Sequence, residues 1–424
     1  MGYDFKPWKS AKAIADGPSI LAYIQETVTE HNLSGHIQLN HRVEAADWDS
    51  TQSLWRVSVT DTQTQQTCLF TCSVLYVCAG YYDYKKGYLP KYPNLDAFEG
   101  TLIHPQHWPK DLAYDGKNVV IIGSGATAVT LLPSMAPHAH RVTMLQRSPT
   151  YLVAWPAVDR IGRLLKRLMP LRWAYFITRQ KNIRVQQFVY GFARRYPQQA
   201  KRWLLRRIRK ELGPDFDIQR HFTPSYNPWE QRLCLTPDSD FFHALRSENA
   251  SICTDRIEHF TKNGIQLTSG AHLDADIVVS ATGLNLALFG KIQFSINGSV
   301  VDCGQRFTYK GVALSGMPNL FACFGYINAS WTLRADLTSR FVCRVLNHMA
   351  NTQTQVATPT LDPRAPSMNR KPWVDGFSPG YFRRAGTLFP VQGDMAPWHN
   401  PQNYAIDQNY LINTDVADGI LRFQ

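Results

Sequence analysis

The sequence lacks the features that would place it in a membrane, in a secretory route or in a metal-binding class. It has no apolar run of the roughly 20 residues that a transmembrane helix needs. Its first ten residues, MGYDFKPWKS, carry no apolar core of a secretory signal. Its eight cysteines form no CxxC pair and no Cys/His set with zinc spacing. We therefore expect a cytoplasmic protein with free thiols and no metal site.

The chain does have the composition of a folded protein. Its apolar fraction of 44% and aromatic fraction of 12% exclude a disordered class, and 424 residues suffice for two or three domains. Local patterns predict a helix over Ser19–His31, a strand over His36–Val43, and an irregular tail from Thr352. Three apolar residues share one face of that helix: Ile20, Ile24 and Val28.

Positive charge is concentrated in one segment. Residues 157–212 hold sixteen Lys and Arg against two acids, Asp159 and Glu211, a local net charge of +14 in a chain of +12. Apolar residues are interleaved with these cations, and Pro170 and Pro197 interrupt an otherwise helical pattern. The segment has three interpretations: a solvated helical insertion, a peripheral contact with an anionic membrane, or a nucleic-acid surface. No nucleic-acid motif accompanies the charge, so we expect no nucleic-acid partner.

A glycine turn lies between a predicted strand and a predicted helix. Lys117–Ile122 is an apolar run of strand type, Thr127–Met135 is helix-like, and Arg141–Leu145 is a second strand. The G-x-G-x-x-A turn between the first two predicts a pyrophosphate site at the helix N-terminus. Gln146 and Arg147 follow the second strand where NAD-binding proteins place an acid, and a cation there favours the 2′-phosphate of NADPH. The predicted cofactor-binding residues of the turn are Gly123, Ser124, Gly125, Ala126 and Thr127.

A second motif lies directly upstream, Phe98-x-Gly100-x-x-x-His104-x-x-x-Trp108-Pro109. A single His or Trp ordinarily packs in the core or on the surface. The whole string, however, resembles the F-x-G-x-x-x-H-x-x-x-W-P/D fingerprint of type I Baeyer–Villiger monooxygenases, flavoenzymes that bind FAD and NADPH. The resemblance implies that His104 and Trp108 couple cofactor motion to catalysis rather than transfer protons.

The resemblance extends along nearly the whole chain. HPQHWP, IGSGATAVTL, TMLQRSPTY, YNPWxQRLCL, ATGLNLxLFG and GYxNASWTL are similar to the ethionamide-activating subgroup of mycobacteria. It implies an α/β fold with two Rossmann-like dinucleotide-binding domains. The expected parts are a remnant of an FAD domain (1–110), an NADPH domain (111–283) with a basic helical insertion at about 157–235, and a returning part of the FAD domain with an irregular tail (284–424).

The resemblance also implies an activity and its residues. The expected enzyme is a flavin-dependent NADPH monooxygenase that uses O2 to insert oxygen into a ketone, or onto the sulfur of a sulfide or thioamide. Arg232, in NPWEQRLCLTP, matches the family's essential arginine by context; its constant charge suits an oxyanion, and a surface ion pair is the alternative. Tyr326, Asn328 and Ser330 are candidates for contacting the flavin or its ribityl chain, with ordinary packing as the alternative.

One part of the family pattern is missing. Such enzymes begin with their own FAD fingerprint, a G-x-G-x-x-G turn followed by an acid at the end of the second strand. The present sequence begins at Gly2-Tyr3-Asp4, which resembles family sequence from just after that region. We therefore expect the first Rossmann-like domain to be truncated at its N-terminus and to bind FAD poorly or not at all. The alternative function is a catalytically impaired NADPH-binding fragment of such an enzyme.

Overall fold

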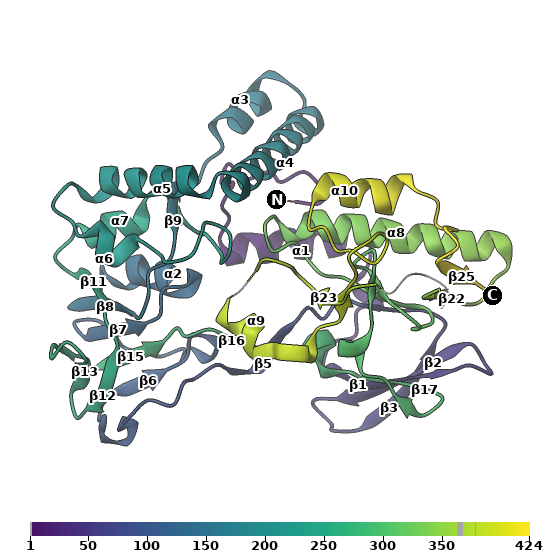
Figure 1. Cartoon of the computed structure of the whole chain (residues 1–424), viewed down its shortest axis with the longest axis horizontal. Coiled ribbons are helices and arrows are strands. Elements are labelled where there is room, and N and C mark those ends of the chain that lie inside the picture. The colour runs from purple at the N-terminus through teal and green to yellow at the C-terminus, as the bar shows by residue number, and fades with distance from the viewer. Residues whose placement is uncertain (1, 363–367, 378) are drawn as a thin grey trace.

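The computed structural model describes residues 2–362, 368–377 and 379–424. Figure 1 shows two α/β halves side by side, with a pair of helices projecting above them. The chain passes between the halves in two strands, β5 (Tyr82–Gly87) and β16 (Leu284–Leu286), which pair antiparallel. Among the described helices, none is long and apolar enough to cross a lipid bilayer.

The nucleotide half, which carries the glycine turn, is built on a five-stranded parallel sheet in the order β11-β8-β7-β15-β6. Its central strands are runs of Val and Ile that are almost fully buried, as parallel strands covered on both faces require. The strand–turn–helix–strand unit predicted from the sequence is confirmed, with α2 (Ala126–Met135) after the turn. The strands are β6 (Thr101–Ile103), β7 (Asn118–Ile122), β8 (Arg141–Gln146), β11 (Ala250–Thr254) and β15 (Ile277–Ser280).

Both faces of this sheet are covered. On one face lie α2, α6 (Ile218–Phe222) and α7 (Asp240–Leu245), with side chains such as Leu132 and Phe241 completely buried. On the other face a meander packs its Phe260 and Ile265 against the sheet. Each such burial contributes about 1.5–3 kcal/mol, so this half has a substantial core of its own. The meander is β12 (Ile257–Thr261), β13 (Gly264–Leu267) and β14 (His272–Asp274).

One domain boundary differs from the expected one. β6 was expected to belong to the first domain, which was to end at residue 110. In the structure β6 pairs with β15, Leu102 opposite Val278, and is the outer strand of the nucleotide sheet. The chain therefore enters the nucleotide half after β5. Such parallel pairing joins residues far apart in sequence and leaves no local pattern from which to predict it.

Besides two short two-stranded pairs in the C-terminal tail, the described part of the second half contains two larger sheets and two long helices, α1 (Gly17–Glu30) and α8 (Trp331–Thr352). One sheet has the order β18-β17-β1-β2-β3, and the other has the order β19-β20-β21-β4. β4 is therefore an end strand: β21 pairs with one side, and no described strand pairs with the other. The strands are β1 (His41–Asp49), β2 (Leu54–Asp61), β3 (Thr67–Cys72), β4 (Leu75–Val77), β17 (Gln293–Ile296), β18 (Ser299–Val300), β19 (Thr308–Tyr309), β20 (Ala313–Leu314) and β21 (Leu320–Ala322).

The strand predicted over His36–Val43 is wrong in its position. β1 begins at His41 and continues to Asp49, in register with β2. The register is fixed by two tryptophans, Trp48 and Trp55, which lie opposite each other and are 2% and 0% exposed. Burial of this aromatic pair stabilises the later register, because a one-residue slip of either strand would turn the tryptophan of that strand to solvent.

The helix predicted near the N-terminus is confirmed as α1, but its apolar face is not buried. Ile20 and Ile24 are 46% and 42% exposed. The helix is held through Tyr23 instead, whose hydroxyl accepts from the Tyr3 N–H at 2.9 Å and donates to the Lys6 carbonyl at 2.6 Å. The described chain thus leaves this apolar face uncovered.

The basic segment forms three helices, with the breaks at the predicted prolines. They are α3 (Arg160–Leu168), α4 (Leu171–Arg195) and α5 (Pro197–Leu212). Two parallel strands, β9 (Leu152–Trp155) and β10 (Cys234–Pro237), lie at the base of the insertion. Figure 1 shows α3 and α4 projecting from the molecule, whereas α5 lies along the nucleotide half.

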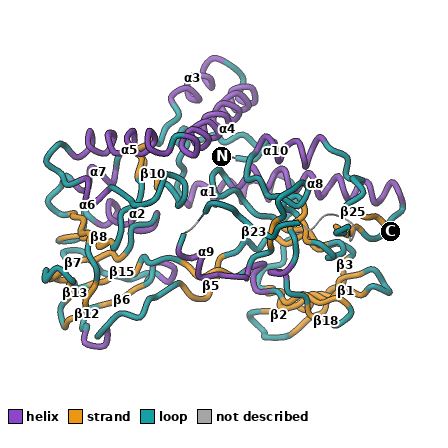
Figure 2. The backbone as a smooth tube through the Cα atoms, in the orientation of Figure 1, coloured by secondary structure: helices purple, strands orange, loops and turns teal. Residues whose placement is uncertain are grey.

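The C-terminal tail is largely loop, as predicted (Figure 2). A buried ion pair fastens it: the Arg334 guanidinium on α8 contacts the Asp407 carboxylate, and these side chains are 3% and 2% exposed. A second pair joins Lys310 to Asp418 at 3.0 Å. The tail elements are α9 (Gly380–Ala385), α10 (Tyr404–Gln408), a π-helical turn (Asn409–Asn413), β22 (Ala357–Pro359), β23 (Lys371–Pro372), β24 (Val391–Gln392) and β25 (Leu421–Phe423).

Candidate active site

Four loops meet at the carboxyl edge of the five-stranded sheet. Gly123 follows β7, Arg147 follows β8, Gly283 lies just after β15, and His104 follows β6. Parallel strands end at the same edge, and the strand order reverses between β7 and β15. This is the crevice in which open α/β sheets bind ligands. The sheet thus brings together residues from the fingerprint and from the glycine turn.

The glycine turn has the geometry of a pyrophosphate site. Gly123 has φ +142°, and a Cβ there would lie 2.4 Å from the Ala281 carbonyl oxygen, so only glycine permits this close approach. Gly125 is the N-cap of α2, and open space surrounds the position of a Cβ there. Ala126 and Thr127 are exposed, and Ser124 is half-buried. The first N–H groups of α2 are therefore accessible to an anion, as the predicted cofactor site requires.

The two residues after β8 have different environments. Gln146 is 1% exposed, and its amide nitrogen donates to the His221 carbonyl and to the Thr254 hydroxyl, both at 2.8 Å. The structure therefore places Gln146 in the wall of the domain, where it joins β8, β11 and α6. Arg147 is exposed, and no described carboxylate lies within ion-pair distance of it. Arg147 is thus the predicted cofactor residue whose charge faces the solvent.

His104 links the sheet edge to the strands between the halves. Its Nδ1 accepts from the Gln106 N–H at 3.2 Å, so Nε2 carries the proton and donates to the Gly283 carbonyl at 3.0 Å. The ring also lies against Gly87 at the end of β5, where a Cβ would be 2.0 Å from the imidazole. Trp108 is partly buried and packs against the core of the nucleotide half. His104 therefore lies where the halves meet, Trp108 lies within the nucleotide half, and neither forms part of a proton relay among the described residues.

Arg232 is partly buried at the same junction. Its Nε donates to the Tyr381 hydroxyl at 3.3 Å, and Tyr81 and Tyr82 also lie beside it. No described carboxylate pairs with the guanidinium, so the surface ion pair considered from the sequence is not formed. Burial raises the pKa of the Tyr381 phenol, and the Arg232 charge counteracts part of that rise. Among the described residues, the positive charge of Arg232 therefore lies beside phenols and has no carboxylate partner.

The three tyrosines were not predicted as site residues. Tyr81 and Tyr82 follow the Ala79-Gly80 end of the apolar run that contains β4, a position that a sequence reading could have examined. Tyr81 is 1% exposed, and burial raises the pKa of its phenol. Tyr381 comes from α9 in the tail, far away in sequence and without a recognisable motif. Only the folded chain brings it to Arg232.

The residues predicted to contact flavin are engaged with the C-terminal tail. Tyr326 is 1% exposed and donates its hydroxyl to Asp407 at 2.7 Å. Asn328 donates to the Gln402 carbonyl at 2.9 Å. Ser330 is the residue before α8 and shares a hydrogen bond with the Thr332 hydroxyl at 2.9 Å. The packing alternative therefore accounts for the side chains of Tyr326 and Asn328 in this structure.

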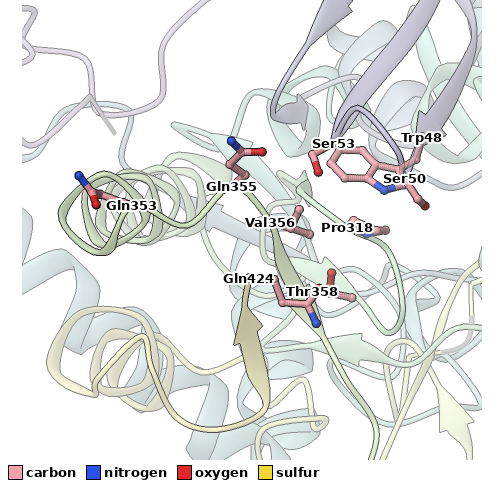
Figure 3. A pocket seen from close by; sticks show the side chains of 9 residues that line it. All are labelled: Trp48, Ser50, Ser53, Pro318, Gln353, Gln355, Val356, Thr358 and Gln424. Carbon is pink, nitrogen blue, oxygen red and sulfur yellow. The ribbon is translucent and has the colours of Figure 1, made fainter.

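A cavity of about 420 Å³ lies elsewhere, between the β1–β2 turn and the end of α8 (Figure 3). Serine, threonine and glutamine side chains line it together with Trp48, Pro318 and Val356. No charged side chain and no predicted site residue contributes to its wall. It supplies no acid, base or nucleophile, so the junction around Arg232 is the better candidate for chemistry.

Fold and site together define a two-domain α/β protein with a dinucleotide crevice beside an unpaired arginine. A family model for flavin-binding monooxygenase-like proteins matches residues 13–206. The chain is 46% identical over its whole length to the FAD-containing monooxygenase EthA of Mycolicibacterium smegmatis, of which it covers 85%. It is 45% identical, again over its whole length, to the probable FAD-binding monooxygenase AlmA of an Acinetobacter species, of which it covers 84%. The chain therefore belongs to the flavin-binding monooxygenase-like family, and the resemblance stated from its motifs is confirmed.

Solved structures confirm the fold. A steroid monooxygenase bound to NADP aligns with a TM-score of 0.68 at 21% identity, over 83% of this chain and 74% of that one. OTEMO in complex with FAD and NADP aligns with a TM-score of 0.67 at 19% identity, over the same shares of the two chains. The prediction of an α/β fold of the two-dinucleotide type is thereby confirmed.

Proposed function

We propose that this protein is an FAD- and NADPH-dependent monooxygenase that transfers one oxygen atom from O2 to a ketone, or to the sulfur of a sulfide or thioamide. The observation that carries the proposal is the unpaired Arg232 at the junction of the halves, next to the dinucleotide crevice. The names of the relatives, FAD-containing and FAD-binding monooxygenases, support the cofactor and the class of reaction. The bound NADP and FAD named in the solved neighbours support the pair of cofactors.

The residues of the crevice fit NADPH. The N–H groups at the start of α2 would hold the pyrophosphate, since no side chain caps that helix. Arg147 would hold the 2′-phosphate through charge-assisted hydrogen bonds. His104 would hold the Gly283 loop against the strands that join the halves, and so position the nicotinamide end of the crevice. The NADPH supplies the reducing equivalents, and these residues bind and orient it.

Arg232 would act at the oxygen-transfer end. A guanidinium remains charged at every working pH, and no carboxylate in the described part of the chain neutralises this one. Preorganised charge of this kind stabilises an oxyanion developing at the substrate. Burial raises the pKa of the Tyr81 and Tyr381 phenols, so both would stay neutral beside the guanidinium, and the Tyr381 hydroxyl would hold it in position. Electrostatic stabilisation by one such group typically contributes about 10²–10³ in rate.

A second candidate function, an NADPH-binding fragment with impaired flavin chemistry, is favoured by one observation. No described strand pairs with the outer side of β4, and the sequence holds no second glycine turn to receive the FAD pyrophosphate. The described residues therefore offer a pyrophosphate site and a 2′-phosphate partner for NADPH, and they offer less for FAD. In this candidate the 424-residue chain binds NADPH and holds FAD weakly.

One experiment on the purified 424-residue chain separates the two candidates. FAD content would be measured by absorbance after purification and again after incubation with added FAD. NADPH oxidation would then be followed with an aryl ketone and with a thioether, and products would be examined for the mass of one added oxygen. Oxygenated product that disappears in Arg232→Ala and persists in the exposed control Arg220→Ala supports the monooxygenase. NADPH binding without retained FAD or product supports the fragment.

A further inference from the structure

α3 and α4 project from the molecule (Figure 1), and large apolar side chains at the corner between them are exposed to solvent. α3 packs on α4 through Gly162, where a Cβ would lie 3.1 Å from Thr178. Because the small face of α3 is turned inwards, its large side chains are turned outwards. Ile161, Leu164 and Leu168, spaced three and four residues apart on one face, are 57%, 55% and 71% exposed.

The first two turns of α4 continue this surface. Ala174 and Tyr175 face the body of the protein and are buried, whereas Trp173 is 64% exposed. Large exposed apolar residues gathered on two packed helices are typical of an interaction site rather than of ordinary surface. We define the apolar corner as seven exposed residues: Ile161, Leu164, Leu168, Leu171, Trp173, Phe176 and Ile177.

Unpaired arginines surround the apolar corner. Arg160, Arg163, Arg167 and Arg172 are all exposed, and no described carboxylate lies within ion-pair distance of any of them. The nearest acid in sequence, Asp159, is already engaged. One of its carboxylate oxygens caps α3 at the Gly162 N–H, 2.9 Å away, and the other accepts from the Lys181 ammonium at 2.6 Å. The positive charge of this surface is therefore not neutralised within the described chain.

The corner is held rigidly on the rest of the molecule. The Lys166 ammonium donates to three backbone carbonyls of the N-terminal segment, at residues 8, 9 and 10. The Tyr175 hydroxyl donates to the Tyr3 carbonyl at 2.8 Å, and Arg179 pairs with Asp336 on α8 at 2.7 Å. A preformed surface loses little conformational freedom on binding, which favours association.

We propose that the apolar corner inserts into the interfacial region of an anionic phospholipid bilayer, with the four arginines at the headgroup phosphates. Amphipathic helices bind in this way, with their apolar face buried roughly 5–10 Å and their cations at the lipid surface. Trp173 suits the interface, and guanidinium groups pair with phosphate in a bidentate manner. A nucleic acid would account for the arginines but not for the seven apolar residues. A second copy of this chain would cover the apolar residues but leave the arginines without partners.

The test is sedimentation of the full chain with vesicles of phosphatidylcholine alone and of phosphatidylcholine mixed with phosphatidylglycerol. The expected result is binding to the mixed vesicles that weakens as salt rises. Each cation near an anionic surface contributes about fivefold to partitioning, so the triple variant Arg163→Glu/Arg167→Glu/Arg172→Glu loses on the order of 100-fold or more. The variant Leu168→Ser/Trp173→Ser loses roughly tenfold or more, because it removes buried apolar area.

A matched control removes exposed apolar residues elsewhere. Leu69→Ser/Val300→Ser changes two side chains, 65% and 67% exposed, on β3 and β18 of the second half, and should bind vesicles as the parent does. Circular dichroism would verify that each variant is folded. Equal binding to both vesicle types, or parental binding by both corner variants, would overturn the proposal.

Two further results would overturn it by identifying another occupant. Analytical ultracentrifugation without lipid would show whether the parent is an oligomer and whether Leu168→Ser/Trp173→Ser converts it to a monomer. If it does, and if the parent does not bind vesicles, the apolar corner is a contact between copies of this chain. An oligonucleotide bound equally by the parent and by that variant, again without vesicle binding, would make the arginines a nucleic-acid surface.

Discussion

Replacement of Arg147 should separate NADPH from NADH binding. The side chain follows β8 at the carboxyl edge of the nucleotide sheet, is exposed, and has no described carboxylate partner. A charge-assisted hydrogen bond is worth roughly 1.5–3 kcal/mol. Because solvent reaches this guanidinium, we take the lower end, about 1.5 kcal/mol, which corresponds to about a tenfold rise in Kd. Arg147→Ala should therefore weaken NADPH binding about tenfold and leave NADH binding unchanged.

The control for this variant lies on the same strand. Arg141 begins β8 and is exposed, and six residues separate it from Arg147, or about 20 Å at 3.3 Å per residue. That distance exceeds two Debye lengths of about 8 Å at physiological salt, so Arg141→Ala should affect neither cofactor. Binding would be measured by calorimetric titration of both nucleotides into the purified chain, which does not require the flavin to be retained. An equal loss for NADPH and NADH, or no loss for either, would refute the assignment of the 2′-phosphate to Arg147.

Three further changes test the structure around the site. Asp407→Ala leaves the buried Arg334 guanidinium without a carboxylate and should cost about 3–5 kcal/mol in the free energy of unfolding, measured in urea. Gly87→Ala places a Cβ 2.0 Å from the His104 ring and should lower the free energy of unfolding by about 1–3 kcal/mol. It should also lower the yield of product per NADPH oxidised. Burial lowers the pKa of His221 in the folded chain, whereas the same imidazole in the unfolded chain binds a proton near pH 6.5. The parent should therefore lose stability relative to His221→Gln as the pH falls through about 6.5, by at most about 1.4 kcal/mol per pH unit, in denaturation curves at pH 7.5 and 5.5.

Each of these outcomes has a comparison within the same chain. Gly191 lies exposed in α4 with open space around it, so Gly191→Ala should be neutral or stabilising where Gly87→Ala is not. His36 is exposed, and His36→Gln is the matched control for these denaturation curves because it removes an imidazole that is not buried. If Asp407→Ala lowered the free energy of unfolding by less than about 1 kcal/mol, the Arg334 guanidinium would not depend on its buried carboxylate partner, contrary to this expectation.

The elements that the sequence predicted well are those with local signals. The glycine turn lies between an apolar run and a helix, and both appear at the expected residues. The basic segment breaks at Pro170 and Pro197 because proline cannot continue a helix hydrogen-bonded to the preceding turn. The type of each such element and its approximate bounds can be predicted from these patterns, because the residues that determine them are neighbours in the chain.

What could not be predicted depends on pairing between distant residues. Gln146 follows a strand as predicted, but its amide is used by residues of α6 and β11, more than 70 residues away in sequence. Tyr326 and Asn328 lie in a recognisable motif, and the tail that binds their side chains carries no signal of that contact. The same holds for Tyr381, which completes the surroundings of Arg232.

The antiparallel pair between the halves has a consequence for how this protein is assembled. Gly87 ends β5 directly opposite Leu284 of β16, so the nucleotide half leaves and rejoins the other half at adjacent points. Residues 88–283 therefore form a module inserted into a single gap of the surrounding domain, with its own buried core and with neighbouring ends. Such a module can be excised without a long linker, since a few residues would bridge the gap. The expectation is that 88–283 folds by itself and binds NADPH, which makes nucleotide recognition separable from the rest of the chain.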